Sequence, residues 1–261
     1  MNYGLKGRVA LVNGASSGIG EGVARALAAE GADLVLCARG AQKLEEVAAA
    51  ISRETGVQAL AFSVDVSARG AAKEAVGAAV AAFGGLDILV NNSGGPPGGR
   101  FEELSDEQWR GAAELLLMSA VQFSREAIAV MAPRGWGRVI NISSISVRQP
   151  IDGLMLSNAL RSAVIGFAKT LSAEVGAQGI TVNNILPGRI HTPRLDYLAD
   201  RQVEAGRARE EVFAAWTAEI PVGRLGNPGD IGALAAFLAS EQASFITGAS
   251  IPVDGGMIKA L

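Results

Sequence analysis

Residues 13–20 read Asn-Gly-Ala-Ser-Ser-Gly-Ile-Gly and join the apolar run Val9–Val12 to an alanine-rich segment with helical periodicity. This context predicts a strand, a tight turn and a helix. Glycines permit the sharp turn and let a phosphate approach the main chain without a Cβ in its way. The free N–H groups at the start of the helix attract anions. The stretch predicts a dinucleotide diphosphate site, with an ordinary strand-to-helix loop as the alternative, since its Gly-x3-Gly-x-Gly spacing differs from GxGxxG.

Composition narrows the class of protein. The 261 residues are 49% hydrophobic and 19% charged, with a formal net charge of −3, one Cys and one His. This balance offers no basic surface for nucleic acid. With no uninterrupted run of about 18 apolar residues and no signal pattern at the N-terminus, we expect a cytoplasmic protein without membrane association. We expect no metal site, and Cys37 is interpreted as a small buried hydrophobe.

Strand-like runs alternate with helical periodicity along the chain. The apolar runs lie at 8–13, 33–38, 58–64, 86–91, 137–143, 180–186 and 246–253. Their alternation with helices predicts a parallel sheet that is covered on both faces. We therefore predict an α/β fold, a single doubly wound (Rossmann) domain over residues 1–261 with seven parallel strands. Its ligand is expected at the carboxyl ends of the strands, near the reversal of strand order.

Residues 189–227 interrupt the alternation of strands and helices with a long, charge-rich segment between the sixth strand and the last helix. An insertion at the carboxyl end of a strand is placed to act as a lid over a ligand. The alternative is a solvated surface helix at about 198–218, and both interpretations can hold together.

Further motifs follow the glycine turn in order. Asp65-Val66 comes after the third strand, Asn91–Gly94 after the fourth, and Pro187–Thr192 at the end of the sixth. The tail contains Arg224–Pro228, Phe237–Ser240, Ile246–Gly248 and Val253–Gly256. Over almost the whole chain these motifs resemble the short-chain dehydrogenase/reductase family, and its 3-oxoacyl-acyl-carrier-protein reductase type most closely.

The resemblance implies a nicotinamide dinucleotide cofactor and places residues along it. The glycine turn would meet the pyrophosphate, Asp65 the adenine, Asn92 the ribose, and Ile190 and Thr192 the nicotinamide carboxamide. Asn13 stands where the family usually has Thr. The expected cofactor-binding residues are Gly14, Ser16, Ser17, Gly18, Ile19, Gly20, Arg39, Asp65, Val66, Asn92, Gly94, Pro187, Gly188, Ile190 and Thr192.

The end of the second strand bears on the choice between NADP and NAD. An acidic residue there binds the ribose 2′-hydroxyl, whereas an arginine accommodates a 2′-phosphate. This chain has Ala38 followed by Arg39. A guanidinium can fork onto phosphate, so we expect NADP, with NAD as the alternative if Arg39 only caps the strand or stacks on adenine.

The catalytic pattern that the resemblance implies is Asn, Ser, Tyr and Lys, and it is incomplete here. The segment Ser157–Lys169 aligns with the family's YxASKxAVxGxxK, which puts Ser157 at the Tyr position and Arg161 at the Lys position. Ser144 keeps the serine position, and Leu116 stands where Asn is usual. Ser144, Ser157 and Arg161 are the candidate catalytic residues, and Ser143 is interpreted as structural.

These replacements change the available chemistry. A serine is a far weaker acid than a phenol, and an arginine supplies charge and donors but cannot relay a proton. Because Ser157 and Arg161 share a helix face, Arg161 could stabilise an oxyanion or hold ribose hydroxyls while water delivers the proton. Alternatively both are relics. Tyr197 and His191 are possible substitute acids, and Arg148 and Asp152 are candidates for the substrate mouth.

We therefore expect an NADP(H)-binding short-chain oxidoreductase that acts on a small carbonyl or hydroxyl substrate, such as a 3-oxoacyl thioester, with an atypical proton donor. Two alternatives stay open: a non-catalytic dinucleotide-binding sensor or assembly subunit, and a lyase or isomerase using the same pocket. The resemblance also implies a homotetramer, built from helices at about 105–132 and 152–176 and the carboxyl-terminal strand.

Overall fold

A computed structural model describes residues 3–259; residues 1, 2, 260 and 261, the ends of the expected domain, lie outside the described range. One parallel sheet has the strand order β3-β2-β1-β4-β5-β6-β7. The order reverses between β1 and β4, as in a doubly wound fold. The predicted Rossmann sheet of seven parallel strands is confirmed. The strands are β1 (Val9–Asn13), β2 (Asp33–Ala38), β3 (Ala59–Ser63), β4 (Ile88–Asn91), β5 (Gly137–Ile142), β6 (Ile180–Pro187) and β7 (Ser250–Val253).

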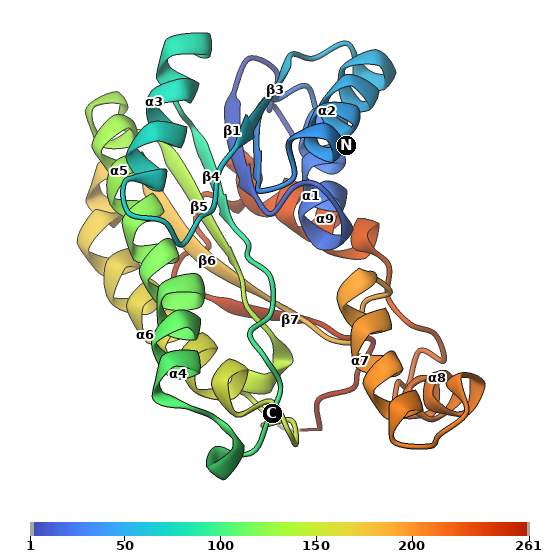
Figure 1. The fold of residues 1–261 in the computed structure, drawn as a ribbon. Helices are drawn as coiled ribbons and strands as arrows, with labels where there is room; N and C mark the ends of the chain where they lie inside the picture. The colour runs from blue at the N-terminus through green and yellow to red at the C-terminus, as the bar shows by residue number, and fades with distance from the viewer. Residues whose placement is uncertain (1–2, 260–261) are drawn as a thin grey trace.

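Helices cover both faces of the sheet (Figure 1). On one face lie α1 (Gly18–Ala29), α2 (Ala41–Thr55) and α9 (Pro228–Ala239), and on the other α3 (Ala71–Phe83), α5 (Ser119–Met131) and α6 (Met155–Val175). Side chains alternate between the faces as strand geometry requires. In β1, Ala10 and Val12 pack toward α1 and α9, while Val9 and Leu11 pack toward α3 and α5.

Helices α1 and α9 approach each other closely through glycine. A Cβ on Gly232 would lie 2.6 Å from the carbonyl oxygen of Gly22, and a Cβ on Gly22 would lie 2.5 Å from Pro228 Cβ. Any larger side chain would force the helices apart. The two glycines therefore fix α9 against the helix that follows the 13–20 turn.

Helix α4 (Asp106–Ala113) continues into α5 through the π-helical turn Glu114–Met118. The continuous helix Asp106–Arg134 is, within the described residues, the one helix long and apolar enough to cross a membrane by length and composition, with a mean hydropathy of 1.4. Phe123, Ala127 and Met131 of this helix are fully buried in the core against the sheet. The core helix of a globular domain passes the same test, so its composition has an explanation within the fold.

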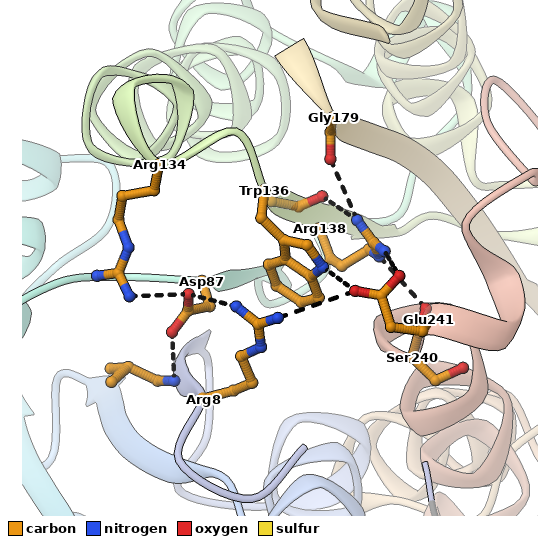
Figure 2. Close-up of polar contacts among 10 residues, drawn as sticks. Arg8, Asp87, Arg134, Trp136, Arg138, Gly179, Ser240 and Glu241 are labelled. Atoms are coloured by element: carbon orange, nitrogen blue, oxygen red, sulfur yellow. Dashed lines mark hydrogen bonds and ion pairs between the residues drawn. The ribbon is translucent and has the colours of Figure 1, made fainter. Parts of the chain in front are cut away.

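Where β1, β4 and β5 begin, charged side chains from these strands and their preceding loops contact one another (Figure 2). The buried carboxylate of Asp87 accepts hydrogen bonds from Val9 N at 2.9 Å and Arg8 Nη1 at 3.2 Å, and it pairs with Arg134 Nη2 at 3.3 Å. Nearby, the guanidinium groups of Arg8 and Arg138 lie 3.6 and 4.2 Å from the ring centroid of Trp136. These contacts lie at the amino-terminal ends of the strands, opposite the carboxyl ends where the ligand is expected.

The segment 189–227 forms two helices, α7 (Pro193–Glu204) and α8 (Arg209–Ala218), so the expected single helix at 198–218 is wrong. The chain turns between them at Gly206, which has a φ of +94°. The two helices bury a small cluster of their own: Leu195, Ala199, Val212 and Trp216. The segment is therefore more than a solvated helix, and it projects beside the carboxyl ends of β6 and β7 (Figure 1).

Candidate active site

The 13–20 turn has the geometry that its glycines predict. Gly14 and Gly18 have φ values of +64° and +57°, which L side chains rarely adopt. A Cβ on Gly20 would lie 2.1 Å from the carbonyl oxygen of Gly14, so the turn folds back tightly onto the first turn of α1. Any side chain at position 20 would open the turn.

Two other loops fasten this turn from neighbouring strands. Asn92, after β4, donates its Nδ2–H to the carbonyl oxygens of Asn13 at 3.1 Å and Gly14 at 3.4 Å. A Cβ on Gly18 would lie 3.2 Å from Thr192 Cγ2, which places the loop after β6 against the start of α1. The predicted residues from three separate motifs thus meet at the point where the strand order reverses.

The residues at this point fit a dinucleotide diphosphate. Among the described residues, the N–H groups of Gly18, Ile19 and Gly20 at the start of α1 have no hydrogen-bond acceptor, and the Ser17 side chain does not cap the helix. A Cβ on Gly94 would meet nothing within 4 Å, so the backbone of the β4 loop is open on that side. Unpaired N–H groups beside open backbone are suited to hold phosphate oxygens.

The loop after β6 is held by its own main chain. Pro187 is the last residue of β6, and Gly188 N donates to Val253 O at 3.0 Å. A Cβ on Gly188 would lie 2.8 Å from Asp254 Cα, so only glycine lets these strands approach so closely here. Ile190 is buried and bridges to Gly226, while the Thr192 hydroxyl accepts from Leu195 N at 3.4 Å as the N-cap of α7.

Arg39 and Asp65 come together at the carboxyl ends of β2 and β3. The Asp65 carboxylate accepts from Ser67 Oγ at 2.7 Å and Ser67 N at 2.9 Å; these bonds, with a smaller effect of the Arg39 charge, lower its pKa. Arg39 is exposed and, among the described residues, forms no ion pair. Its guanidinium is therefore available for a phosphate at this edge.

Ser157 and Arg161 meet on one face of α6. Arg161 donates from Nε to Ser157 Oγ at 3.1 Å and from Nη1 to the carbonyl oxygens of Ile142 at 3.0 Å and Ser143 at 3.1 Å. Burial lowers the pKa of Arg161 to about 10, and the charge of Arg194 adds to this shift. The guanidinium stays charged at neutral pH and is fixed to the end of β5.

Ser144 and Ser143 differ in the use of their hydroxyl groups. Ser144 Oγ accepts from Ser146 N at 3.1 Å as the N-cap of the short helix Ile145–Val147, which leaves its own proton free to be donated. Ser143 Oγ is buried and has no hydrogen-bond partner within the described part of the chain. The sequence interpretation of Ser143 as structural misses this unpaired hydroxyl.

A cavity of about 20 Å³ lies between the sheet and α5 and α6. A cavity of this volume has room for one water molecule. Three unpaired polar atoms belong to its lining residues: Asn13 Oδ1, Asn91 Oδ1 and Ser143 Oγ. Arg161 and Leu116, the residues at the Lys and Asn positions of the family pattern, lie on its wall.

Asparagines extend from this cavity across the sheet at one register. Asn91 donates from Nδ2 to Asn141 Oδ1 at 2.9 Å, and Asn141 donates from Nδ2 to Asn184 Oδ1 at 3.0 Å. Asn184 continues to Ser250 Oγ at 3.1 Å. This row was not predicted from the sequence. An asparagine near the end of a buried apolar strand does indicate a buried hydrogen-bonding partner.

The two substitute acids lie in the α7–α8 segment. His191 is 61% exposed, with its Nε2 at 3.7 Å from Asp196 Oδ1 and its ring at the edge of Phe213. Tyr197 is exposed and lies beneath the Arg194 guanidinium at 5.1 Å. Neither lines the cavity, and Arg148 and Asp152 are exposed before α6. Among residues 3–259, no cluster of three or more His, Cys, Asp or Glu side chains gathers as a metal site.

Known proteins match this chain over nearly its whole length. A family model described as enoyl-(acyl carrier protein) reductase matches residues 14–258. The 3-oxoacyl-[acyl-carrier-protein] reductase of Escherichia coli K12 is 35% identical over 257 residues, covering 98% of this chain and 99% of that protein. This chain belongs to the short-chain dehydrogenase/reductase family. The resemblance predicted from the motifs is confirmed.

Solved structures of the short-chain dehydrogenase/reductase family superpose on this member over nearly its whole length. L-sorbose reductase of Gluconobacter frateurii, complexed with NADPH and L-sorbose, is 36% identical with a TM-score of 0.96, and the match covers 100% of both chains. An actinorhodin polyketide ketoreductase with NADPH is 34% identical with a TM-score of 0.93, covering 97% and 98%. At the level of the family, the expected oxidoreductase class and NADP cofactor are confirmed.

Proposed function

We propose that this protein is an NADPH-dependent reductase of small carbonyl compounds, in which Ser144 and Ser157 bind the reacting oxygen and Arg161 polarises Ser157. NADPH supplies the hydride when it is bound. The geometry of Arg161 carries the proposal: its Nε–H polarises the Ser157 hydroxyl at 3.1 Å, and its Nη1 is fixed to strand carbonyls. A hydrogen bond from a cation to a hydroxyl oxygen makes that hydroxyl a stronger donor.

The carbonyl oxygen is placed to accept hydrogen bonds from the free protons of Ser144 and Ser157. Both hydroxyl oxygens already accept an N–H, from Ser146 and Arg161, so each proton is directed elsewhere. As hydride adds to the carbonyl carbon, negative charge grows on the oxygen, and preorganised donors stabilise it. The proton that gives the alcohol would come from bulk solvent through a water molecule, for which the cavity beside Arg161 has room, so that no hydroxide is left at the site.

The cofactor is held by the residues of the glycine turn and the three loops around it. The free N–H groups at the start of α1 would bind the diphosphate, and Arg39 would bind the 2′-phosphate that distinguishes NADPH. The NADPH complexes of the sorbose reductase and the polyketide ketoreductase support this assignment. A 3-oxoacyl thioester is a candidate substrate, since the Escherichia coli relative is a 3-oxoacyl-[acyl-carrier-protein] reductase.

The proposal extends to the organisation of the chain. It is one domain, residues 1–261, in which 189–227 with α7 and α8 acts as a lid over the substrate. The protein is cytoplasmic and assembles as a homotetramer through the long helices Asp106–Arg134 and α6 and the carboxyl-terminal strand. Sedimentation of the purified protein tests the assembly.

Fluorescence titration with NADPH, followed by absorbance assays with 3-oxoacyl thioesters, small ketones and oxo acids, tests the function. We expect NADPH binding and NADPH oxidation with at least one carbonyl class. Absence of NADPH binding would contradict the proposal. Binding without turnover of any compound would favour a dinucleotide sensor, and product formation without NADPH oxidation would favour a lyase or isomerase.

A further inference from the structure

Two arginines at the candidate site lack an acidic partner. Arg161 uses Nε and Nη1 for Ser157 and two strand carbonyls, and its Nη2 has no hydrogen-bond acceptor among residues 3–259. Arg194 donates from Nη2 to Pro96 O at 2.8 Å. Within the same residues neither guanidinium forms an ion pair, whereas Arg189, on the loop between them in sequence, pairs with Glu219 at 2.6 Å.

The two cations act on each other. Burial lowers the pKa of both Arg161 and Arg194 and is the largest cause of each shift. The charge of Arg194 lowers the pKa of Arg161 further. Both arginines are partly buried, and two like charges that are partly withdrawn from water, without a carboxylate partner among residues 3–259, destabilise the folded protein. An anion that enters between them relieves both costs, and a carboxylate matches the forked donors of a guanidinium.

Arg194 follows Thr192 and Pro193, which pack on Gly18 of the diphosphate turn, but its side chain is directed to the loop after β4. Arg194 lies in the first turn of α7 and reaches the loop after β4: a Cβ on Gly95 would lie 2.6 Å from its Nε. That loop leaves the cavity wall at Ser93 and meets the segment before α6, where Gly99 N donates to Gly153 O at 2.7 Å. The diphosphate has its own donors at the start of α1.

We propose that the substrate is an oxo acid, whose carboxylate binds between Arg194 and the free Nη2 of Arg161 while its carbonyl lies at Ser144 and Ser157. This inference rests on the proposed reductase function, and it names the substrate class. The lid then carries a specificity residue, because Arg194 belongs to α7. Neutral sugars and simple ketones lack the group that these arginines bind.

Matched substrates test the proposal. NADPH oxidation is measured with 2-oxo, 3-oxo and 4-oxo carboxylates and with their methyl esters, for the natural protein, Arg194→Gln and the control Arg201→Gln, an exposed residue of the same helix. We expect the natural protein to prefer an acid over its ester by about 100-fold in kcat/KM. Arg194→Gln should remove most of this preference by raising the KM for the acid much more than the KM for the ester, whereas Arg201→Gln should keep it. Equal use of acid and ester, or equal loss for both in Arg194→Gln, would overturn the inference.

A binding measurement keeps the inference separate from the proposed function. The Tm of the NADP⁺-saturated protein is measured with increasing concentrations of the same carboxylates and esters. We expect a carboxylate to raise the Tm of the natural protein but not of Arg194→Gln, even if no compound is reduced; in that case the reductase proposal fails and the anion site stands. No rise with any carboxylate overturns the anion site. A loss of NADPH affinity in Arg194→Gln, without loss of carboxylate binding, also overturns it and assigns Arg194 to the cofactor.

Discussion

Arg161 donates its Nε–H to Ser157 Oγ at 3.1 Å, one helical turn away on α6. The two residues that the sequence alignment predicts at the family's Tyr and Lys positions thus form a single hydrogen-bonded unit. Because the same guanidinium holds the carbonyls of Ile142 and Ser143, the unit is anchored to the end of β5. This argues against the interpretation of the two residues as relics.

Arg161→Lys should lower kcat/KM by about 100-fold, because a single ammonium cannot hold Ser157 and two strand carbonyls in the planar fork of a guanidinium. Steady-state NADPH oxidation measures the effect. In the double variant Ser157→Ala with Arg161→Lys, the loss should be much less than the product of the two single losses, since the residues act as a unit. Multiplicative losses would contradict the coupling.

Arg39→Ala should weaken NADPH binding by about 10-fold or more and leave NADH binding within about twofold, because only NADPH carries the 2′-phosphate. Fluorescence titration gives both dissociation constants. Arg53→Ala, an exposed arginine in the last turn of α2, is the matched control and should change neither. Equal losses for the two cofactors would mean that Arg39 contacts a group they share.

Turnover should decline as the pH rises through about 10, where Arg161 loses its charge. The stability effect of the same group has the opposite sign. Its pKa is lowered by folding, so the unfolded chain binds more protons above pH 10, and this group's contribution to stability rises with pH there. Rates and Tm values measured from pH 8.5 to 10.5 separate the two effects. A rate that falls only together with the Tm would contradict the role of Arg161.

Asp87→Asn should lower the free energy of unfolding by about 3 kcal/mol, because it leaves Arg8 and Arg134 without their shared buried carboxylate. Urea denaturation measures the loss, and Asp106→Asn at an exposed pair on α4 should cost less than about 1 kcal/mol. Since Asp87 lies at the edge of the sheet opposite the candidate site, kcat at 25 °C should be unchanged in both variants.

Trp216→Ala should loosen α7 and α8 without unfolding the sheet, because Trp216 packs in the lid's own cluster with Leu195 and Val212. Trypsin should cleave the variant faster at Arg207, between the two helices, while the main thermal transition shifts little. If α7 and α8 form the lid, the KM for the carbonyl substrate should rise. An unchanged cleavage rate would show that the segment is held by other contacts.

The parts of the site that sequence could predict are those with an obligatory backbone geometry. Gly14 and Gly20 are identifiable because a positive φ and a 2.1 Å approach exclude other residues, and buried strands are identifiable from continuous apolar runs. The division of 198–218 into two helices was not predicted, because the apolar residues of both helices pack into one tertiary cluster and no local pattern separates them. The unpaired groups of Ser143 and Arg194 were not predicted, because whether a hydroxyl or guanidinium has a partner depends on its three-dimensional surroundings. The family pattern also assigns no role to either residue.

The asparagine row ends at the cavity that Arg161 lines and carries no formal charge. Each amide from Asn91 to Asn184 donates toward β7, so the side-chain dipoles line up and their negative ends face the cavity, where Asn91 Oδ1 is unpaired. The row thus presents partial negative charge to the cavity that Arg161 also lines, without placing a carboxylate there. A carboxylate at the same place would lock the guanidinium in a permanent ion pair and would have to be displaced in every turnover. The carbonyls of Ile142 and Ser143 keep the cation in place, and a neutral row beside the cavity leaves its Nη2 open for the proposed anion.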